Sequence, residues 1–228
     1  MGFGKEKPVI KSARFSAPSY KRMQCILSIF KKSYPRAWCS LSYQTPFQLL
    51  ISTILSAQCT DARVNMVTPE LFRCFPDANS MSRASIPQLE KLILSTGFYH
   101  AKAKALKQTS LTLVSHFNGQ VPSDMPSLLT LRGVARKTAN IVLFHSFGKN
   151  EGIAVDTHCM RVSYRLGLTS SPDKQNKIEK ELMALLAKKE WGMYTNYMVS
   201  HGRKFCMALK PDCAGCPLNK LCPSAFKV

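Results

Sequence analysis

Residues 131–140 read Leu-Arg-Gly-Val-Ala-Arg-Lys-Thr-Ala-Asn, a sequence typical of two helices joined through a tight turn. A short helical turn is expected at 127–131, and a nearly all-apolar helix follows from Thr138 to Phe147. The N–H groups at a helix start lack partners within the helix, so that together with the helix dipole they favour an anion there. The turn therefore predicts a phosphate site, and an ordinary turn between core helices is the alternative. The candidate contacts are Arg132, Gly133, Val134, Ala135 and Arg136.

Lys137 stands at the start of the apolar helix, beside Arg136. The helix dipole, the neighbouring charge and the apolar surroundings all disfavour its ammonium form and favour the neutral amine. A neutral amine can attack a sugar carbon and form a Schiff base, so Lys137 is a candidate nucleophile. A lone lysine at such a place is more often a solvated or phosphate-contacting charge.

Asp156 follows the apolar run 153–155 and precedes Thr157-His158. Its carboxylate could deprotonate a nucleophile or stabilise positive charge that develops on a sugar. Aspartate is also a good N-cap for the helix expected from 156 to 166, and both roles are compatible.

The apolar pattern is helical along most of the chain, and no strand-like alternation stands out, so the fold class is all-α. Thr45-Pro46-Phe47-Gln48 predicts a capping box at a helix start. Further helices are expected to end at Gly97, at 118–119 and at Gly148. The same pattern predicts helices over 173–187 and 191–201. The polar connector 149–152 is the best candidate for a domain junction.

The 228 residues carry 32 Lys and Arg against 13 Asp and Glu, a formal net charge of +19. With 45% hydrophobic residues the chain can bury a core, which excludes a wholly disordered basic tail. This charge indicates a polyanionic partner, first of all nucleic acid; nonspecific binding to anionic surfaces is the alternative. The best apolar run, 47–57, is too short and too polar for a membrane span, so no membrane partner is expected.

Four of the nine cysteines lie in the last 23 residues with the spacing C-x6-C-x2-C-x5-C. Structural zinc sites usually show two close pairs of ligands, whereas this spacing has one, so it favours an iron–sulfur cluster while zinc stays open. The expected ligands are Cys206, Cys213, Cys216 and Cys222.

Residues 1–18 lack the continuous apolar segment of a secretory signal, and 1–36 hold nine basic residues with Glu6 as the one acid. We expect an intracellular, DNA-associated monomer, with the bacterial cytoplasm and nucleoid as the first choice. An organellar or nuclear location stays open, because a basic leader, a DNA-contacting arm and a solvated tail all fit this composition.

These motifs together resemble the endonuclease III family of helix-hairpin-helix DNA repair glycosylases. The resemblance covers most of the chain, and the combination in this order is highly specific. Besides the hairpin and the cysteines, it rests on Leu-Ser-Ala-Gln-Cys-Thr-Asp at 55–61, Val-Asp-Thr-His at 155–158 and His-Gly-Arg at 201–203.

The resemblance implies a two-domain helix-hairpin-helix glycosylase fold. A six-helix domain over 38–149 would be inserted into a discontinuous cluster domain formed by 1–37 and 150–228. The family's lysine nucleophile falls on Lys137 and its catalytic aspartate on Asp156, and Gln58 looks like the residue that fills the gap left by an extruded base. The four cysteines would hold a [4Fe–4S] cluster.

The implied activity is that of a bifunctional base-excision repair glycosylase and AP lyase acting on double-stranded damaged DNA. It would remove oxidised or ring-saturated pyrimidines and nick the strand by β-elimination through a lysine Schiff base. A monofunctional adenine DNA glycosylase is disfavoured by Lys137 and by a chain that ends six residues after Cys222. A noncatalytic iron–sulfur DNA-binding module is disfavoured by Lys137 together with Asp156.

The hairpin departs from the family's usual Leu-Pro-Gly-Val-Gly at two positions, Arg132 and Ala135. If the second position needs a positive φ, alanine would strain the turn by about 1 kcal/mol. An extra phosphate contact from Arg132 could offset that strain, so we expect DNA binding to be altered and not lost.

Overall fold

The computed structural model describes residues 20–228, and the described part is all-helical. The expected basic leader or arm lies largely outside the described residues. None of the helices described is long and apolar enough to cross a bilayer. The α-helices are α1 Tyr20–Ser33, α2 Pro46–Leu55, α3 Asp61–Cys74, α4 Ala78–Arg83, α5 Ile86–Ile93, α6 Tyr99–Phe117, α7 Met125–Leu129, α8 Arg136–Phe147, α9 Thr157–Arg165, α10 Gln175–Leu185 and α11 Trp191–Lys204.

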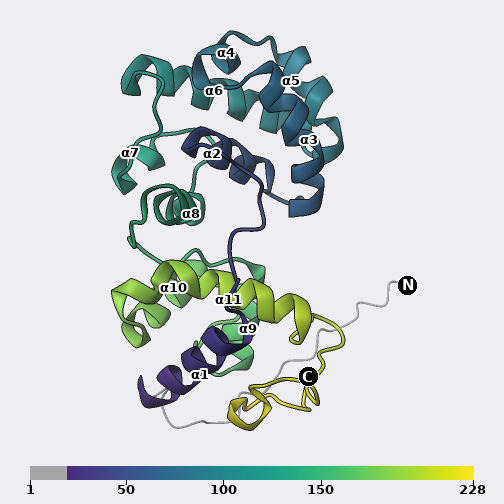
Figure 1. The fold of residues 1–228 in the computed structure, drawn as a ribbon, viewed down its shortest axis with the longest axis vertical. Coiled ribbons are helices and arrows are strands. Elements are labelled where there is room, and N and C mark those ends of the chain that lie inside the picture. The colour runs from purple at the N-terminus through teal and green to yellow at the C-terminus, as the bar shows by residue number, and fades with distance from the viewer. Residues whose placement is uncertain (1–19) are drawn as a thin grey trace, which may run out of the picture.

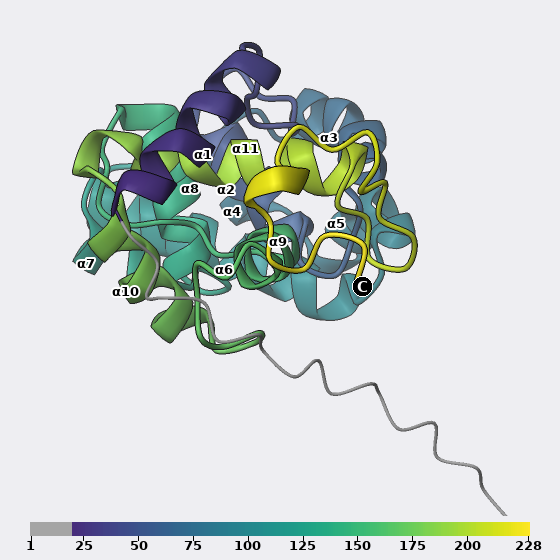
Figure 2. The same cartoon turned by 90° about the horizontal axis from the view of Figure 1, so that it is seen from below.

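The described chain packs around two hydrophobic cores. Buried side chains between Leu41 and Leu143 form the first core, which joins α2 to α8. The second core combines α1 with α9, α10 and α11 and includes Leu218 of the C-terminal loop. Figure 1 shows the two groups of helices one above the other, and Figure 2 shows α1 lying near the C-terminal loop. Helix α1 thus packs with the C-terminal part of the chain.

The helix ends follow local signals in the sequence. Thr45 caps α2 by accepting a hydrogen bond from the Gln48 N–H, and Pro46 takes the first helical position. The Gln48 side chain accepts from the Gln44 N–H, so the return bond of the expected box reaches one residue further back. At the end of α6, Asn118 adopts the left-handed conformation with φ +51°. The expected helix stops are therefore confirmed by backbone geometry.

The apolar pattern did not predict two helices between residues 61 and 83. α3 buries only Val64, Thr68 and Leu71 and contains Pro69, while α4 is six residues long. A sparse apolar stripe and a short length both weaken the helical period. The expected six-helix domain accordingly contains seven α-helices, α2 to α8, when the five-residue α7 is counted.

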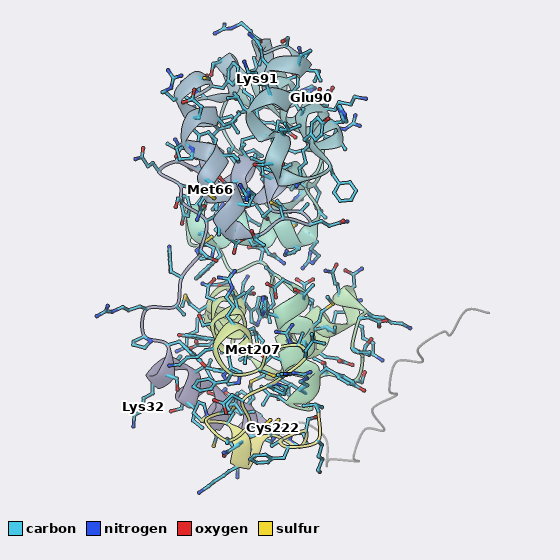
Figure 3. The ribbon with its side chains drawn as sticks, turned by 90° about the vertical axis from the view of Figure 1, so that its right-hand side faces the viewer. Lys32, Met66, Glu90, Lys91, Met207 and Cys222 are labelled. Atoms are coloured by element: carbon cyan, nitrogen blue, oxygen red, sulfur yellow. The ribbon has the colours of Figure 1, made fainter. Side chains whose placement is uncertain are left out.

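The chain passes twice between the two cores, through residues 34–45 and through 148–156. Figure 3 shows the narrow junction where these passages run, with Glu90 and Lys91 of α5 at one end of the molecule. Cys222 lies in the loop at the opposite end. The functional residues discussed next lie on both sides of this junction and at the cysteine end.

Candidate active site in a cleft between the two cores

A cleft of about 800 Å³ is lined by residues from both cores. Three sequence motifs that are far apart in the chain converge there: residues 56–61, 156–158 and Arg203. The complete lining is Ser40, Ser56, Gln58, Cys59, Thr60, Asp61, Ala62, Asn65, Lys137, Asp156, Thr157, His158 and Arg203.

Lys137 and Asp156 line this cleft together. Both also line a smaller adjoining recess of about 90 Å³, whose walls include Trp38 and Phe144. The structure therefore brings the two predicted catalytic side chains to one solvent-reached site from different cores. An amine and a carboxylate in a partly apolar recess can support nucleophilic attack with acid–base assistance.

The hairpin turn places Lys137 in the first turn of α8. Gly133 has φ +81°, a conformation that glycine adopts without strain, and the Val134 N–H donates to the Leu131 carbonyl at 3.2 Å. The Arg132 carbonyl accepts from Thr109 Oγ1 at 2.6 Å, which fastens the turn to α6. Ala135 has φ −98° and ψ 172°, so the anticipated strain of alanine is absent.

The exposed part of the hairpin is smaller than expected. Arg132, Gly133 and Ala135 are exposed, whereas the Val134 side chain is buried in the first core and its N–H closes the turn. Arg136 donates through Nε to Glu179 Oε2 at 2.7 Å, which pairs it within the protein. The structure thus offers Arg132, Gly133 and Ala135 to solvent and engages Val134 and Arg136 internally.

Asp156 caps α9, because its Oδ1 accepts the Cys159 N–H at 2.7 Å. The preceding extended segment is held from two helices. Thr195 Oγ1 of α11 donates to the Ala154 carbonyl at 3.0 Å, and Gln175 Nε2 of α10 donates to the Val155 carbonyl at 3.1 Å. The capping role is therefore present, and it fixes the carboxylate at the cleft wall.

A polar bridge joins the two cores at the cleft. Arg203 donates to Asp61 Oδ2 at 2.7 Å and to Ser40 Oγ at 3.1 Å, and the Ser40 hydroxyl donates to the same carboxylate oxygen at 2.7 Å. Burial lowers the pKa of the neighbouring His158, and the Asp156 carboxylate partly opposes this effect. His158 therefore becomes charged only in more acidic solution than an exposed histidine does.

Gln58 is exposed and has φ +51°, in the left-handed region that non-glycine residues rarely adopt. Phe98 combines the same features, with φ +48° and 67% exposure. Backbone strain of this kind is found at functional sites, where the surrounding structure holds it in place. The sequence pattern signalled Gln58 through its motif and gave no signal for Phe98 beyond the preceding glycine.

The four C-terminal cysteines line one pocket beside α9 and α11. Arg165 of α9 fixes this loop by donating to the Met207 carbonyl at 2.7 Å and the Ala208 carbonyl at 2.8 Å. Its Nη1 also lies 3.5 Å from Cys206 Sγ. No group of three or more His, Cys, Asp or Glu in the described chain could hold a single metal ion as placed. The thiols therefore surround a shared space without converging on one point.

One histidine links the cysteine loop to Tyr34, which directly follows α1. His201 Nε2 lies 3.5 Å from Cys216 Sγ, and His201 Nδ1 lies 2.8 Å from the Tyr34 hydroxyl. Burial lowers the pKa of His201 to about 4 and raises the pKa of the Cys216 thiol to about 11. A buried thiol of this kind becomes a thiolate when a metal centre binds it, so that binding releases protons.

Sequence reasoning missed the residues that act between segments. Ser40 and Trp38 line the cleft and its recess but lie in an irregular stretch with no recognisable motif. Glu179 lies on α10, where an acidic residue in a charged helix gives no sign of burial, yet its side chain is only 7% exposed. Only the fold shows which residues these side chains meet.

Residues 51–188 match the family described as HhH-GPD superfamily base excision DNA repair protein. The chain is 51% identical over 212 residues to endonuclease III of Synechocystis sp., which covers 93% of this chain and 96% of that protein. It is 39% identical to endonuclease III of Bacillus subtilis, over 91% of this chain and 94% of that protein.

Solved structures also match the fold of this chain. A trapped endonuclease III–DNA covalent intermediate matches with a TM-score of 0.87 at 40% identity, over 91% of this chain and 97% of that one. A thermostable thymine-DNA glycosylase matches with a TM-score of 0.81 at 20% identity, which shows a shared fold. By its sequence, its fold and its cleft, this chain belongs to the endonuclease III family and is a DNA N-glycosylase with AP lyase activity.

Proposed function

We propose that the chain removes oxidised or ring-saturated pyrimidines from duplex DNA and then nicks the strand, with Lys137 as nucleophile. The observation that carries this proposal is that Lys137 and Asp156, from two different cores, line the same cleft. Relatives with high coverage are endonuclease III enzymes, and one solved relative is a covalent intermediate with DNA. A covalent complex of that kind requires a nucleophilic side chain.

In the proposed reaction, the lone pair of Lys137 Nζ forms a bond to C1′ of the deoxyribose while the bond from C1′ to the base breaks. The base leaves with the bonding electrons and takes up a proton, and the Nζ ammonium loses one. The remaining Nζ lone pair then forms a protonated imine with C1′ as the C1′–O4′ bond breaks and O4′ takes up a proton. The protonated imine acidifies the C2′ proton. Loss of that proton expels the 3′ phosphate, and water later hydrolyses the imine to release the enzyme.

Asp156 has two parts in this scheme. Its carboxylate stabilises positive charge on the sugar and accepts a proton as the amine attacks. Its hydrogen bond to the Cys159 N–H keeps it at the cleft wall throughout. The aspartate thus acts as a catalytic residue while it caps α9.

The hairpin is the proposed phosphate grip. Arg132, Gly133 and Ala135 are exposed next to the start of α8, where the helix dipole favours an anion. Val134 supports the turn from within the core. Arg136 supports it through its ion pair with Glu179. Contacts to phosphate position the duplex without reading its sequence.

Gln58 is proposed to fill the space that the extruded base leaves. Its exposed amide can form hydrogen bonds with the orphaned partner base, and its left-handed backbone projects it from the α2–α3 turn. Extrusion itself costs a few kcal/mol, least for bases that already stack poorly.

We propose that the four cysteines hold a [4Fe–4S] cluster. They fit this group because four thiols surround one pocket, and a cluster needs more room than a zinc ion bound at about 2.3 Å. Arg161 donates to the Cys206 carbonyl at 3.0 Å, so that two arginines of α9 lie beside the anionic centre. The cluster would stiffen the loop 206–222, and the basic residues of this loop would contact DNA.

The domain organisation follows from the two cores. We propose an inserted domain over 38–149 and a discontinuous cluster domain over 1–37 and 150–228, of which 1–19 lie outside the described residues. We further propose a monomer that works with DNA in the bacterial cytoplasm and nucleoid.

Borohydride reduction tests the chemistry directly. The protein should be trapped covalently on a duplex with one ring-saturated pyrimidine, and Lys137→Ala should abolish trapping. A Lys137→Ala protein that is still trapped would refute the nucleophile. A strand-nicking assay on the same duplex separates this enzyme from a noncatalytic DNA-binding module, which leaves the strand intact.

The cluster has a test of its own. Anaerobically purified protein should be brown, with iron and sulfide in equal amounts, and Cys222→Ser should lower both. A colourless protein that contains zinc would contradict the cluster.

A further inference from the structure

Glu179 is a buried carboxylate that touches three separate segments. From α10, its Oε2 accepts Arg136 Nε at 2.7 Å. Its Oε1 accepts Asn140 Nδ2 at 3.0 Å and the Ile153 N–H at 3.2 Å. Arg136 and Asn140 flank the catalytic lysine on α8, and Ile153 begins the extended segment that ends at Asp156.

Burying a carboxylate is costly unless it is paired and hydrogen-bonded, and Glu179 is both. Its side chain is 7% exposed, against 41% for Arg136. The buried charge therefore stabilises a contact between α10 and the two segments that carry the proposed catalytic groups.

Backbone packing around Glu179 is equally close. A Cβ built on Gly152 would lie 2.1 Å from Glu179 Oε1 and 2.7 Å from Asn140 Nδ2. Only a residue without a side chain lets the connector approach the carboxylate at this point. The 148–156 passage between the cores is thus seated directly on Glu179.

Glu179 is also close to the catalytic lysine in space. Lys137, Arg136 and Glu179 line one recess of about 130 Å³, together with Ile153 and Val155. The same recess includes Gln175, which holds the Val155 carbonyl from the preceding turn of α10. The face of α10 that carries Gln175 and Glu179 therefore contacts the backbone on both sides of the proposed active site.

We propose that Glu179 is a positioning residue that sets Lys137 and Asp156 at their working separation by fastening the start of α8 to the connector. This inference rests on the proposed function of these two residues. It also gives Arg136 a different part from the phosphate contact expected from the sequence: its guanidinium holds the carboxylate in place.

The test is Glu179→Gln, which keeps the size of the side chain and removes its charge. Under single-turnover conditions, the rate of base removal should fall roughly 10- to 100-fold, the scale of a misplacement of about 1 Å. The Kd for a duplex with an uncleavable abasic analogue should stay within about threefold, since the DNA-contacting surface is unchanged. The matched control is Glu181→Gln on the same helix. The Glu181 carboxylate accepts from Ser170, which lies in the loop before α10, and this change should leave rate and Kd at wild-type values.

Wild-type turnover in folded Glu179→Gln would overturn the proposal. So would a parallel loss of rate and binding, because that pattern indicates general damage and not misplacement. Circular dichroism and thermal unfolding establish that the variant is folded.

Arg136→Met keeps the proposal testable if Glu179→Gln does not fold. It removes the guanidinium and retains much of the apolar stem, and it should slow base removal with little change in Kd. A weaker Kd, with a salt slope reduced by about one and an unchanged rate constant, would instead support the phosphate contact and overturn the positioning role.

The roles of Lys137 and Glu179 can be refuted separately. If Lys137→Ala is still trapped by borohydride, the proposed nucleophile is wrong whatever Glu179 does. If Lys137→Ala loses trapping and Glu179→Gln turns over normally, the positioning role alone is wrong.

Discussion

In the proposed mechanism Asp156 combines a structural role with a chemical one, and a set of three substitutions separates them. The cap is the hydrogen bond from the Cys159 N–H to Asp156 Oδ1 at 2.7 Å. Asparagine and serine can also accept this bond, whereas alanine cannot. Only aspartate among the four supplies a carboxylate to the cleft.

The structure gives each substitution an expected size. Asp156→Ala should cost about 1 kcal/mol through loss of the cap, which lowers Tm by roughly 2–4 °C in a chain of this length. Asp156→Asn and Asp156→Ser should stay within about 0.5 kcal/mol of the wild type. All three should lose about 10²- to 10⁴-fold in base removal, the usual contribution of a positioned acid–base group.

The measurements are thermal unfolding and single-turnover base removal from a duplex with one ring-saturated pyrimidine. All three variants should be less active than the wild type. Only Asp156→Ala should also be less stable. Wild-type turnover by Asp156→Asn would refute the chemical role and leave the aspartate as a cap. Activity that follows Tm across the series would refute the separation itself.

Three further predictions concern the hairpin and the helix α8 that follows it. Ala135 is an N-cap in extended conformation without a capping side chain, so Ala135→Ser should stabilise the protein by about 1 kcal/mol, and an unchanged or lower Tm would contradict this. Gly133→Ala should destabilise by about 1–2 kcal/mol through its φ of +81°, because the added Cβ meets Ile54 and Ala105 at an ordinary 3.4 Å; a much larger loss in thermal unfolding would contradict this. Burial lowers the pKa of His145 from 6.5 to about 4, so the unfolded chain binds this proton first as pH falls. The stability from neutral His145 is therefore complete above pH 6.5 and falls as pH drops toward 4, and urea titrations across this range should show a shallower fall for His145→Gln.

Much of the architecture could be predicted because its signals are local. The cap at Thr45, the left-handed stop at Asn118 and the stripe of α1 each act within one or two helical turns. The proposed catalytic residues Lys137 and Asp156 were predicted from motifs, and the structure places both at the cleft. The hairpin was predicted as well, although its alanine turned out to need no positive φ.

The rest depends on contacts between distant segments. The Arg203–Asp61 pair joins residues 142 positions apart, and the bond from Arg136 to Glu179 spans 43. Nothing in the local sequence of α10 distinguishes Glu179 from Glu181, whose side chain is 28% exposed. The internal pairing of Arg136 was likewise out of reach, because a basic residue beside a helix start looks the same whether it meets a phosphate or a buried carboxylate.

The packing of α1 with the C-terminal helices has a consequence for synthesis on the ribosome. Ser33 ends α1, and after Tyr34 the next buried residue of the second core is Ile153, which is made 120 residues after Ser33. At about 5–20 residues per second this interval lasts roughly 6–24 s, long enough for the helices between them to complete their own core. Of the described helices, α1 is thus the first to be made and among the last to pack, and its apolar stripe stays exposed until α9, α10 and α11 emerge.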